Sequence, residues 1–134
     1  MKVFISHALA DKDLAQGVAE ALRASGFQVW DESQIFPGDN WGAQFGQALQ
    51  DADAMVVLLT PHFLQAPNIQ YDISYALGNR DYKGRVVSVI AASPDQLPRD
   101  EIPWVLNKLP MINLTETGRE EGFKRIAQVL QKAA

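Results

Sequence analysis

The chain has 134 residues, of which 47% are hydrophobic and 21% are charged, which is typical of one globular domain and excludes a disordered or collagen-like chain. Sixteen acidic against twelve basic residues give a net charge of −4, which disfavours binding to a phosphate backbone, so we expect no nucleic-acid partner. The absence of cysteine excludes disulfides, thiolate catalysis and cysteine-based metal sites, and it is typical of the reducing cytoplasm, where we expect the protein to act.

Five short runs rich in apolar and β-branched residues predict β-strands. Two of them, the third and the fourth, are almost entirely apolar, as expected for strands that are covered on both faces. The five runs are Lys2–Ser6, Phe27–Trp30, Met55–Leu59, Arg85–Ile90 and Met111–Asn113.

Between the strands, apolar residues recur at the spacing of amphipathic helices. The first series ends before Gly26, a residue type that commonly follows a helix C-terminus. A shorter helix near Glu101–Asn107 contains Pro103, which interrupts it, and the last series follows Thr117 and Glu120 at capping-box spacing. The four series are Leu14, Val18, Ala21 and Leu22; Trp41, Phe45, Ala48 and Leu49; Ile69, Ile73, Ala76 and Leu77; and Phe123, Ile126, Ala127 and Leu130.

This alternation predicts an α/β fold, a flavodoxin-like three-layer sandwich in which a five-stranded parallel sheet of order 2-1-3-4-5 has helices on both faces. We take residues 1–134 as a single domain. In such sheets ligands bind beyond the carboxyl ends of the strands, where the strand order reverses, here between the first and third strands. The segments that follow the first three strands are residues 6–13 (SHALADKD), 31–41 (DESQIFPGDNW) and 60–72 (TPHFLQAPNIQYD).

Several chemistries that this fold hosts lack their residues here. A phosphate-accepting receiver domain needs acidic residues where the first and third strands end, and this chain has Ser6 and Thr60 there. The P-loop, the G-x-G-x-x-G fingerprint and the G-x-S-x-G elbow are all absent. The longest apolar run, Ala54–Leu59, has six residues and the N-terminus lacks a signal-peptide pattern, so we expect no membrane partner.

The two histidines follow the strands that flank the switch point. His7 and His62 could therefore face one crevice, where Asp11 or Asp72 could supply a third metal ligand. Their spacing matches no recognised metal site, so pocket lining or structural hydrogen bonding is the favoured interpretation. We expect no metal and no cofactor.

Several segments resemble, in order and in spacing, those of Toll/interleukin-1 receptor (TIR) domains, in the style of the bacterial stand-alone members. VFISHALADKDLA resembles the first strand and the acidic helix start, and GFQVWDESQIFPGDNW resembles the second strand and the BB loop with its P-G-D turn. VVLLTPHFL resembles the third strand, YDISYALG the third-helix motif and GRVVSVI the fourth strand. The likeness runs from about Lys2 to Ile90 and is weaker beyond.

The resemblance implies one of two functions. Catalytic members cleave NAD⁺ at the nicotinamide–ribose bond and hydrolyse, cyclise or transfer the ADP-ribose, whereas other members are non-catalytic adaptors that self-associate through the BB loop. We favour an NAD⁺ nucleosidase or ADP-ribosyl cyclase, with NAD⁺ as substrate, in bacterial immune (antiphage) signalling. The adaptor is the alternative, and an unrelated flavodoxin-like binding domain is a third interpretation.

Catalytic members carry a glutamate on the third helix, and the matching position here is Asp72. The helical repeat places Asp72 at the edge of the apolar stripe, where a carboxylate would be half-buried at a pocket wall. Such a group can stabilise the positive charge that develops on the ribose as nicotinamide leaves. From periodicity alone, a surface acid near the N-terminal turns of the helix is the competing interpretation.

The resemblance also implies a set of residues that line the substrate pocket around Asp72. Two of them depart from the family pattern, because Asn68 stands where catalytic relatives often have a nucleotide-packing tryptophan and Ala8 stands where some have a basic residue. Stacking would then come from Tyr71, Trp30 or Phe36, whose alternative role is core packing. The substrate-binding set is Ser6, His7, Ala8, Phe36, Thr60, Asn68 and Tyr71.

The BB loop is apolar where polar turn residues are usual between a strand and a helix. Its proline restricts φ and its glycine permits a positive φ, so the tip is partly rigid and suits docking to another chain, with folding back onto its own domain as the alternative. The resemblance implies a homo-oligomer built by TIR–TIR contacts, and a separate sensor or effector protein is a further expected partner. The loop residues are Ile35, Phe36, Pro37, Gly38 and Asp39.

Overall fold

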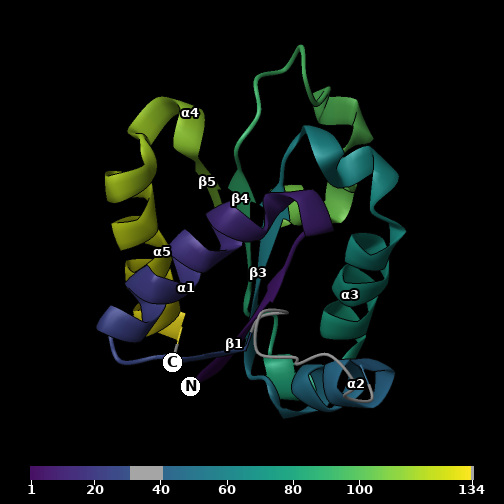
Figure 1. Ribbon diagram of the computed structural model, residues 1–134, viewed down its shortest axis with the longest axis vertical. Helices are drawn as coiled ribbons and strands as arrows, with labels where there is room; N and C mark the ends of the chain where they lie inside the picture. Colours follow the sequence, from purple (N-terminus) through teal and green to yellow (C-terminus); the bar gives the residue numbers. More distant parts are fainter. Residues whose placement is uncertain (31–40, 134) are drawn as a thin grey trace.

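The computed structural model describes residues 1–30 and 41–133, with side chains for all of these except residues 41–45. Its five strands form one parallel sheet in the order β2-β1-β3-β4-β5, which confirms the predicted order (Figure 1). The strands are β1 (Lys2–Ser6), β2 (Gln28–Trp30), β3 (Ala54–Leu59), β4 (Val86–Ile90) and β5 (Met111–Asn113).

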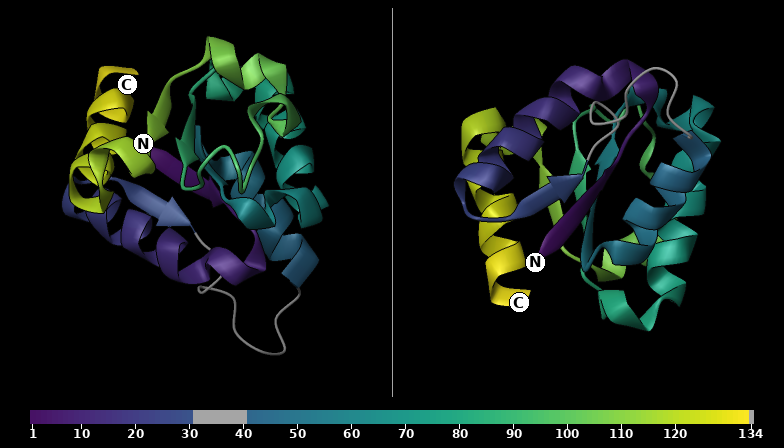
Figure 2. Two further views of the ribbon diagram at one scale, coloured as in Figure 1. Left: turned by 90° about the horizontal axis from the view of Figure 1, so that it is seen from above. Right: turned by 60° about the horizontal axis from the view of Figure 1, so that its bottom comes forward.

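Helices cover both faces of the sheet, as Figure 1 and the two views of Figure 2 show. The helices α1 and α5 pack on one face, and α2 and α3 pack on the other. The α-helices are α1 (Lys12–Ala24), α2 (Trp41–Asp51), α3 (Pro67–Gly78), α4 (Leu114–Thr117) and α5 (Arg119–Ala133). Within the described ranges, no helix has both the length and the hydropathy that crossing a membrane requires.

The core has two halves because successive side chains of a strand point to opposite faces of the sheet. Val56 and Leu58 of β3 join the cluster under α1 and α5, whereas Met55, Val57 and Leu59 join the cluster under α2 and α3. All six residues of β3 are buried, since this strand lies at the centre of the sheet and is covered on both faces. The apolar runs that predicted strands covered on both faces are thus explained.

The end of α1 follows the predicted glycine stop. Gly26 has φ = +94°, and its N–H donates to the carbonyl of Arg23 at 3.0 Å, while the N–H of Phe27 donates to the carbonyl of Leu22 at 3.1 Å. This pair of bonds is the Schellman arrangement, which satisfies the last carbonyls of a helix through a left-handed residue. The motif turns the chain directly into β2.

Two predicted helix features are wrong. The helix expected near Glu101–Asn107 is two 3₁₀ helices, η5 (Arg99–Glu101) and η6 (Trp104–Lys108), separated at Pro103, which cannot donate a backbone hydrogen bond. Thr117 is not the residue before the last helix, which begins at Arg119 after Gly118, and its hydroxyl donates to the carbonyl oxygens of Gly118 (2.8 Å) and Asn113 (3.4 Å). Thr117 instead ends α4, and the chain turns at Gly118 before α5.

Candidate functional site

The carboxyl ends of β1 and β3 lie side by side, since Ser6 at the end of β1 pairs with Val57 of β3. The chain leaves β1 through the 3₁₀ helix η1 (Leu9–Asp11) and leaves β3 at Thr60, through the 3₁₀ helix η3 (Pro61–Gln65). It then enters α3, whose first residue is Pro67, a favoured position for proline. This edge is the switch point to which the sequence pointed, and most of the predicted site residues lie on it.

Asp72 is fully buried at this edge. It shares the inner face of α3 with Ile69, Ile73 and Ala76, and its side chain is 1% exposed. The hydroxyl of Ser6 donates to Asp72 Oδ2 at 2.7 Å, a side-chain contact between residues 66 positions apart. The expectation of a half-buried wall residue is therefore wrong in degree, because a hydrogen-bond donor from β1 lets the carboxylate lie inside.

The charge of Asp72 also affects the pKa of Tyr82, which lies after the C-terminal end of α3. Burial, followed by the charges of Tyr75, Asp72 and Asp53, raises the pKa of Tyr82 above its ordinary value. Tyr82 therefore stays protonated, and its hydroxyl donates to the carbonyl of Leu49 at 2.7 Å. The phenol thus ties the end of α2 to the 3₁₀ helix η4 (Arg80–Tyr82) behind the carboxylate.

A second set of contacts joins the start of α3 to the end of β1. The amide of Asn68 donates to the carbonyl of His7 at 3.3 Å, and His7 Nδ1 lies 2.8 Å from the carbonyl oxygen of Ala8. Since a carbonyl oxygen only accepts, Nδ1 carries the hydrogen of this bond. His7 and Ala8 are buried, whereas Asn68 and Tyr71 are exposed, so the predicted residues divide into a buried floor and an exposed rim on α3.

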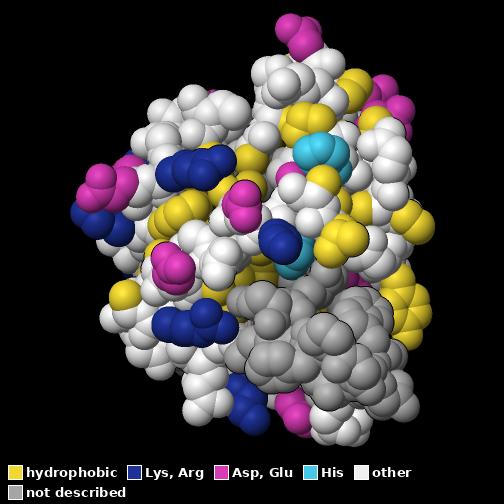
Figure 3. All heavy atoms as spheres, viewed as in Figure 1, with side chains coloured by type: hydrophobic (Ala, Val, Ile, Leu, Met, Phe, Trp, Pro, Cys, Tyr) yellow, Lys and Arg dark blue, Asp and Glu magenta, His cyan; other side chains and the backbone are white. Residues whose placement is uncertain are grey.

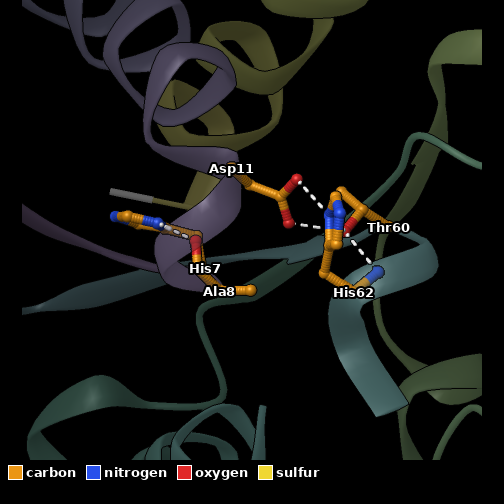
Figure 4. A network of polar contacts seen from close by, with 5 residues as sticks. All are labelled: His7, Ala8, Asp11, Thr60 and His62. Atoms are coloured by element: carbon orange, nitrogen blue, oxygen red, sulfur yellow. Dashed lines mark hydrogen bonds and ion pairs between the residues drawn. The ribbon is translucent and has the colours of Figure 1, made fainter. Parts of the chain in front are cut away.

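Thr60 belongs to a third group, a polar network with Asp11 and His62 (Figure 4). Its hydroxyl donates to Asp11 Oδ2 at 2.5 Å and accepts from the backbone N–H of His62 at 3.1 Å. The ring nitrogen His62 Nδ1 lies 2.9 Å from Asp11 Oδ1. The side chain of Asp11 is 9% exposed and that of His62 is 53% exposed, so a buried carboxylate holds a histidine that solvent can reach. Histidine atoms are visible at the surface on this face of the molecule, in cyan (Figure 3).

The two histidines do not share one crevice. Figure 4 shows the ring of His7 directed away from the pair formed by Asp11 and His62. Among the residues that the structure describes, no group of three or more histidine, aspartate or glutamate side chains could hold a metal ion. The sequence favoured pocket lining or structural hydrogen bonding for His62 and named Asp11 only as a possible third metal ligand. It did not predict their direct pairing, although both follow strands that flank the switch point.

Of the aromatic residues predicted to stack on the nucleotide, Trp30 packs on the core and Tyr71 is exposed. Trp30 stacks on Phe4 with ring centroids 5.2 Å apart and an interplanar angle of 7°, so it packs on the core. The side chain of Tyr71 is 65% exposed next to Asp72 in the sequence. The predictions for Phe36 and for the rest of the BB loop, Ile35 to Asp39, fall outside the described residues.

A cavity of about 290 Å³ lies elsewhere, against β2 and the C-terminal end of α2. Lys2, Trp30 and Asp51 are among the described residues that line it, and neither Asp72 nor Ser6 is. It opens beside the edge strand β2, away from the junction between β1, β3 and α3. The hydrogen-bonded groups at the carboxyl edge therefore remain the candidate site.

The chain matches the family model of the TIR domain over residues 3–127. It is 33% identical over 114 residues to the 2′ cyclic ADP-D-ribose synthase BtTIR of Bacteroides thetaiotaomicron, a match that covers 81% of this chain and 39% of that protein. The chain thus spans about two fifths of the length of this curated relative.

Two solved structures share the fold at low sequence identity. One is a metazoan TIR-STING receptor from C. gigas, in complex with 2′,3′-cGAMP, with a TM-score of 0.73 and 19% identity over 95% of this chain and 38% of that one. The other is the CMP N-glycosidase BcmB of Clostridium botulinum, with a TM-score of 0.59 and 13% identity over 94% of this chain and 97% of that one. At these identities the likeness bears on the fold alone.

Proposed function

The chain belongs to the TIR domain family, and we propose that it cleaves the nicotinamide–ribose bond of NAD⁺ with Asp72 as the catalytic carboxylate. The name of the Bacteroides relative, a cyclic ADP-ribose synthase, supports this class of substrate. The family resemblance of the third helix supports the residue, since Asp72 occupies the position at which catalytic members have a glutamate.

The observation that carries the proposal is the bond from Ser6 to Asp72. A carboxylate that is 1% exposed is costly to bury, and the Ser6 hydroxyl at 2.7 Å fixes its orientation at the switch point. When nicotinamide leaves with the bonding electron pair, positive charge develops on the ribose, as in glycoside hydrolysis. A fixed negative group at that point stabilises the charge without reorganising during the reaction.

The proposal includes the fate of the ribosyl group. Water that attacks it gives linear ADP-ribose, and a hydroxyl of the same nucleotide that attacks it gives a cyclic product; the name of the Bacteroides relative favours looking for the cyclic form first. NAD⁺ is then the substrate, and the reaction needs no further cofactor. We also propose a role in bacterial immune signalling, with self-association and a separate sensor or effector protein as the context of the activity.

The test is nicotinamide release by three variants of purified protein. Asp72→Asn keeps the shape and removes the charge, so it should abolish release with little loss of stability. Asp72→Glu restores the family residue. In a pocket with the family geometry it should raise the rate about tenfold or more, which corresponds to about 1.4 kcal/mol in the barrier, and in a pocket adapted to aspartate it should slow the reaction. Asp81→Asn, a matched change at an exposed aspartate of η4, should leave the rate unchanged.

Chromatography and mass analysis of NAD⁺ and its products provide the measurement, and thermal melting of each variant checks the fold. Equal NAD⁺ consumption by wild type, Asp72→Asn and Asp72→Glu would show that Asp72 is not catalytic. No consumption by the wild type at high protein concentration would instead favour the adaptor.

A further inference from the structure

We propose that His62, held by Asp11, is the general base of the NAD⁺ reaction, with Nε2 accepting the proton of the hydroxyl that attacks the ribose. The assignment rests on the proposed function and adds a second group to Asp72, at the same edge of the sheet. Asp11 and Thr60 are positioning residues in this scheme.

The hydrogen bonds of Asp11 determine which nitrogen of His62 is available. A carboxylate only accepts, and Asp11 Oδ2 already accepts from the Thr60 hydroxyl, so the contact of 2.9 Å at Oδ1 requires the hydrogen on His62 Nδ1. In a neutral imidazole the other nitrogen, Nε2, is then the acceptor. A carboxylate that orients a histidine in this tautomer is the arrangement that makes the ring a base in hydrolytic triads.

Asp11 orients the ring and Thr60 fixes the backbone that carries it, but the ring is not enclosed. The backbone N–H of His62 donates to Thr60 Oγ1 at 3.1 Å, and Thr60 caps η3, which carries the histidine. Asp11 and Thr60 are buried, while 53% of the side-chain surface of His62 is exposed. A substrate at this edge can therefore reach the ring, whereas the groups that orient it are shielded from solvent.

Two side-chain pairs connect the end of β1 to the segment that follows β3: Asp11 with His62, and Ser6 with Asp72. Each joins a residue at or after the end of β1 to a residue in the segment that follows β3. Since β1 and β3 are neighbours in the sheet, both pairs belong to the switch point, where a ligand of this fold binds. The proposal assigns both groups, the buried Asp72 and the accessible His62, to one substrate at this edge.

The reaction needs such a group because it releases a proton. The C–N bond breaks and its electron pair leaves with nicotinamide; an oxygen lone pair of water or of a nucleotide hydroxyl forms the new C–O bond, and the O–H proton must go to a base. His62 Nε2 takes that proton and later returns it to solvent. Hydrolysis therefore yields ADP-ribose, nicotinamide and H⁺, and cyclisation yields cyclic ADP-ribose, nicotinamide and H⁺. A base of this kind contributes about 100-fold to 10,000-fold in rate.

A nucleophile without a proton separates this role from bond cleavage. A neutral pyridine such as 3-acetylpyridine attacks the same ribosyl carbon through its nitrogen lone pair and releases no proton, so base exchange does not require His62. His62→Asn retains an N–H that can donate to Asp11 but has no basic nitrogen. It should lower the formation of ADP-ribose and its cyclic form about 100-fold or more, and should leave base exchange within about threefold of wild type.

The remaining variants make each outcome decisive. Asp72→Asn should lose both hydrolysis and base exchange. Asp11→Asn should reduce hydrolysis and cyclisation, which release a proton, and should leave base exchange unchanged. Wild-type amounts of ADP-ribose and its cyclic form from His62→Asn would overturn the base assignment while leaving the NAD⁺ activity standing, and so would equal loss of exchange and hydrolysis in a folded variant. A wild type that neither releases nicotinamide nor exchanges it would overturn the proposed function itself.

Discussion

At the scale of single residues, Tyr82 has a protonation equilibrium that the fold controls. Its phenol is buried and donates to the carbonyl of Leu49, and burial, followed by the charges of Tyr75, Asp72 and Asp53, raises its pKa above the ordinary value of 10.0. In the unfolded chain the phenol loses its proton near pH 10, while in the folded chain it keeps it. Above pH 10 the unfolded state therefore binds fewer protons, and the free energy of unfolding falls as the pH rises.

The substitution Tyr82→Phe should therefore have two effects on stability. At pH 7 it should lower the free energy of unfolding by about 1–2 kcal/mol, because the buried carbonyl of Leu49 loses its donor. Above pH 10 the difference between the two proteins should shrink, since phenylalanine cannot ionise in the unfolded state. Urea unfolding of both proteins between pH 7 and pH 11 measures the difference, and a constant gap across that range would contradict the assignment.

Single residues also show which features of the candidate site could be predicted from the sequence. The strand order and the family resemblance suffice to bring Ser6, Thr60 and Asp72 to one edge. The burial of Asp72 could not be predicted, because it depends on a donor 66 residues away rather than on the periodicity of its own helix. The pairing of Asp11 with His62 depends on side-chain directions in two 3₁₀ segments, and the strand and helix pattern does not describe such segments.

At the scale of elements, strand positions were more predictable than irregular segments. β1 and β5 have the predicted bounds, and the apolar runs locate the other three strands to within one residue at each end. The runs work well because a strand covered on both faces has little choice of residue type. Around Pro103 the sequence pattern fails, since a proline and a few apolar residues are compatible with either a bent helix or two 3₁₀ turns.

Replacing two of the glycines by alanine should change the free energy of unfolding in opposite directions. Gly26 ends α1 with φ = +94°, where a Cβ is strained, so Gly26→Ala should lower the free energy of unfolding by about 1–2 kcal/mol. Gly46 lies within α2, and a Cβ built on it meets no atom of the described residues within 4 Å, so Gly46→Ala should raise the free energy of unfolding by about 0.5–1 kcal/mol. Urea unfolding of the two variants is the measurement, and a stabilised Gly26→Ala would contradict the Schellman interpretation.

At the scale of the whole molecule, the sequence could predict the fold because its signals agree across levels. Apolar strands, helical repeats and the order of the family segments all favour one parallel sheet, and the sheet confirms the order β2-β1-β3-β4-β5. The family match over residues 3–127 confirms the resemblance, although the likeness beyond Ile90 is weak in the sequence itself. The self-association through Ile35–Asp39 and the extension of one domain over residues 1–134 stay predictions.

The same architecture predicts how stability is distributed over the sheet. β3 pairs with β1 on one side and β4 on the other, and all six of its residues are buried, so its amides cannot exchange with solvent unless both halves of the core separate. Among the described strands, β5 is a three-residue edge strand that pairs only with β4, and two of its residues, Met111 and Asn113, are partly exposed. Opening β5 breaks one strand interface and leaves the remaining sheet paired.

Native-state hydrogen exchange at increasing urea concentration measures this difference. The amides of Val56, Val57 and Leu58 should exchange with the free energy and the urea dependence of global unfolding. The amides of β5 that bond to β4 should exchange with a free energy at least about 2 kcal/mol lower and with a weaker urea dependence, because a local opening exposes less surface. Equal free energies in β3 and β5 would mean that the edge opens only with the whole sheet. Lower values in β3 than in β5 would contradict the central position of β3, on which the geometry of the carboxyl edge depends.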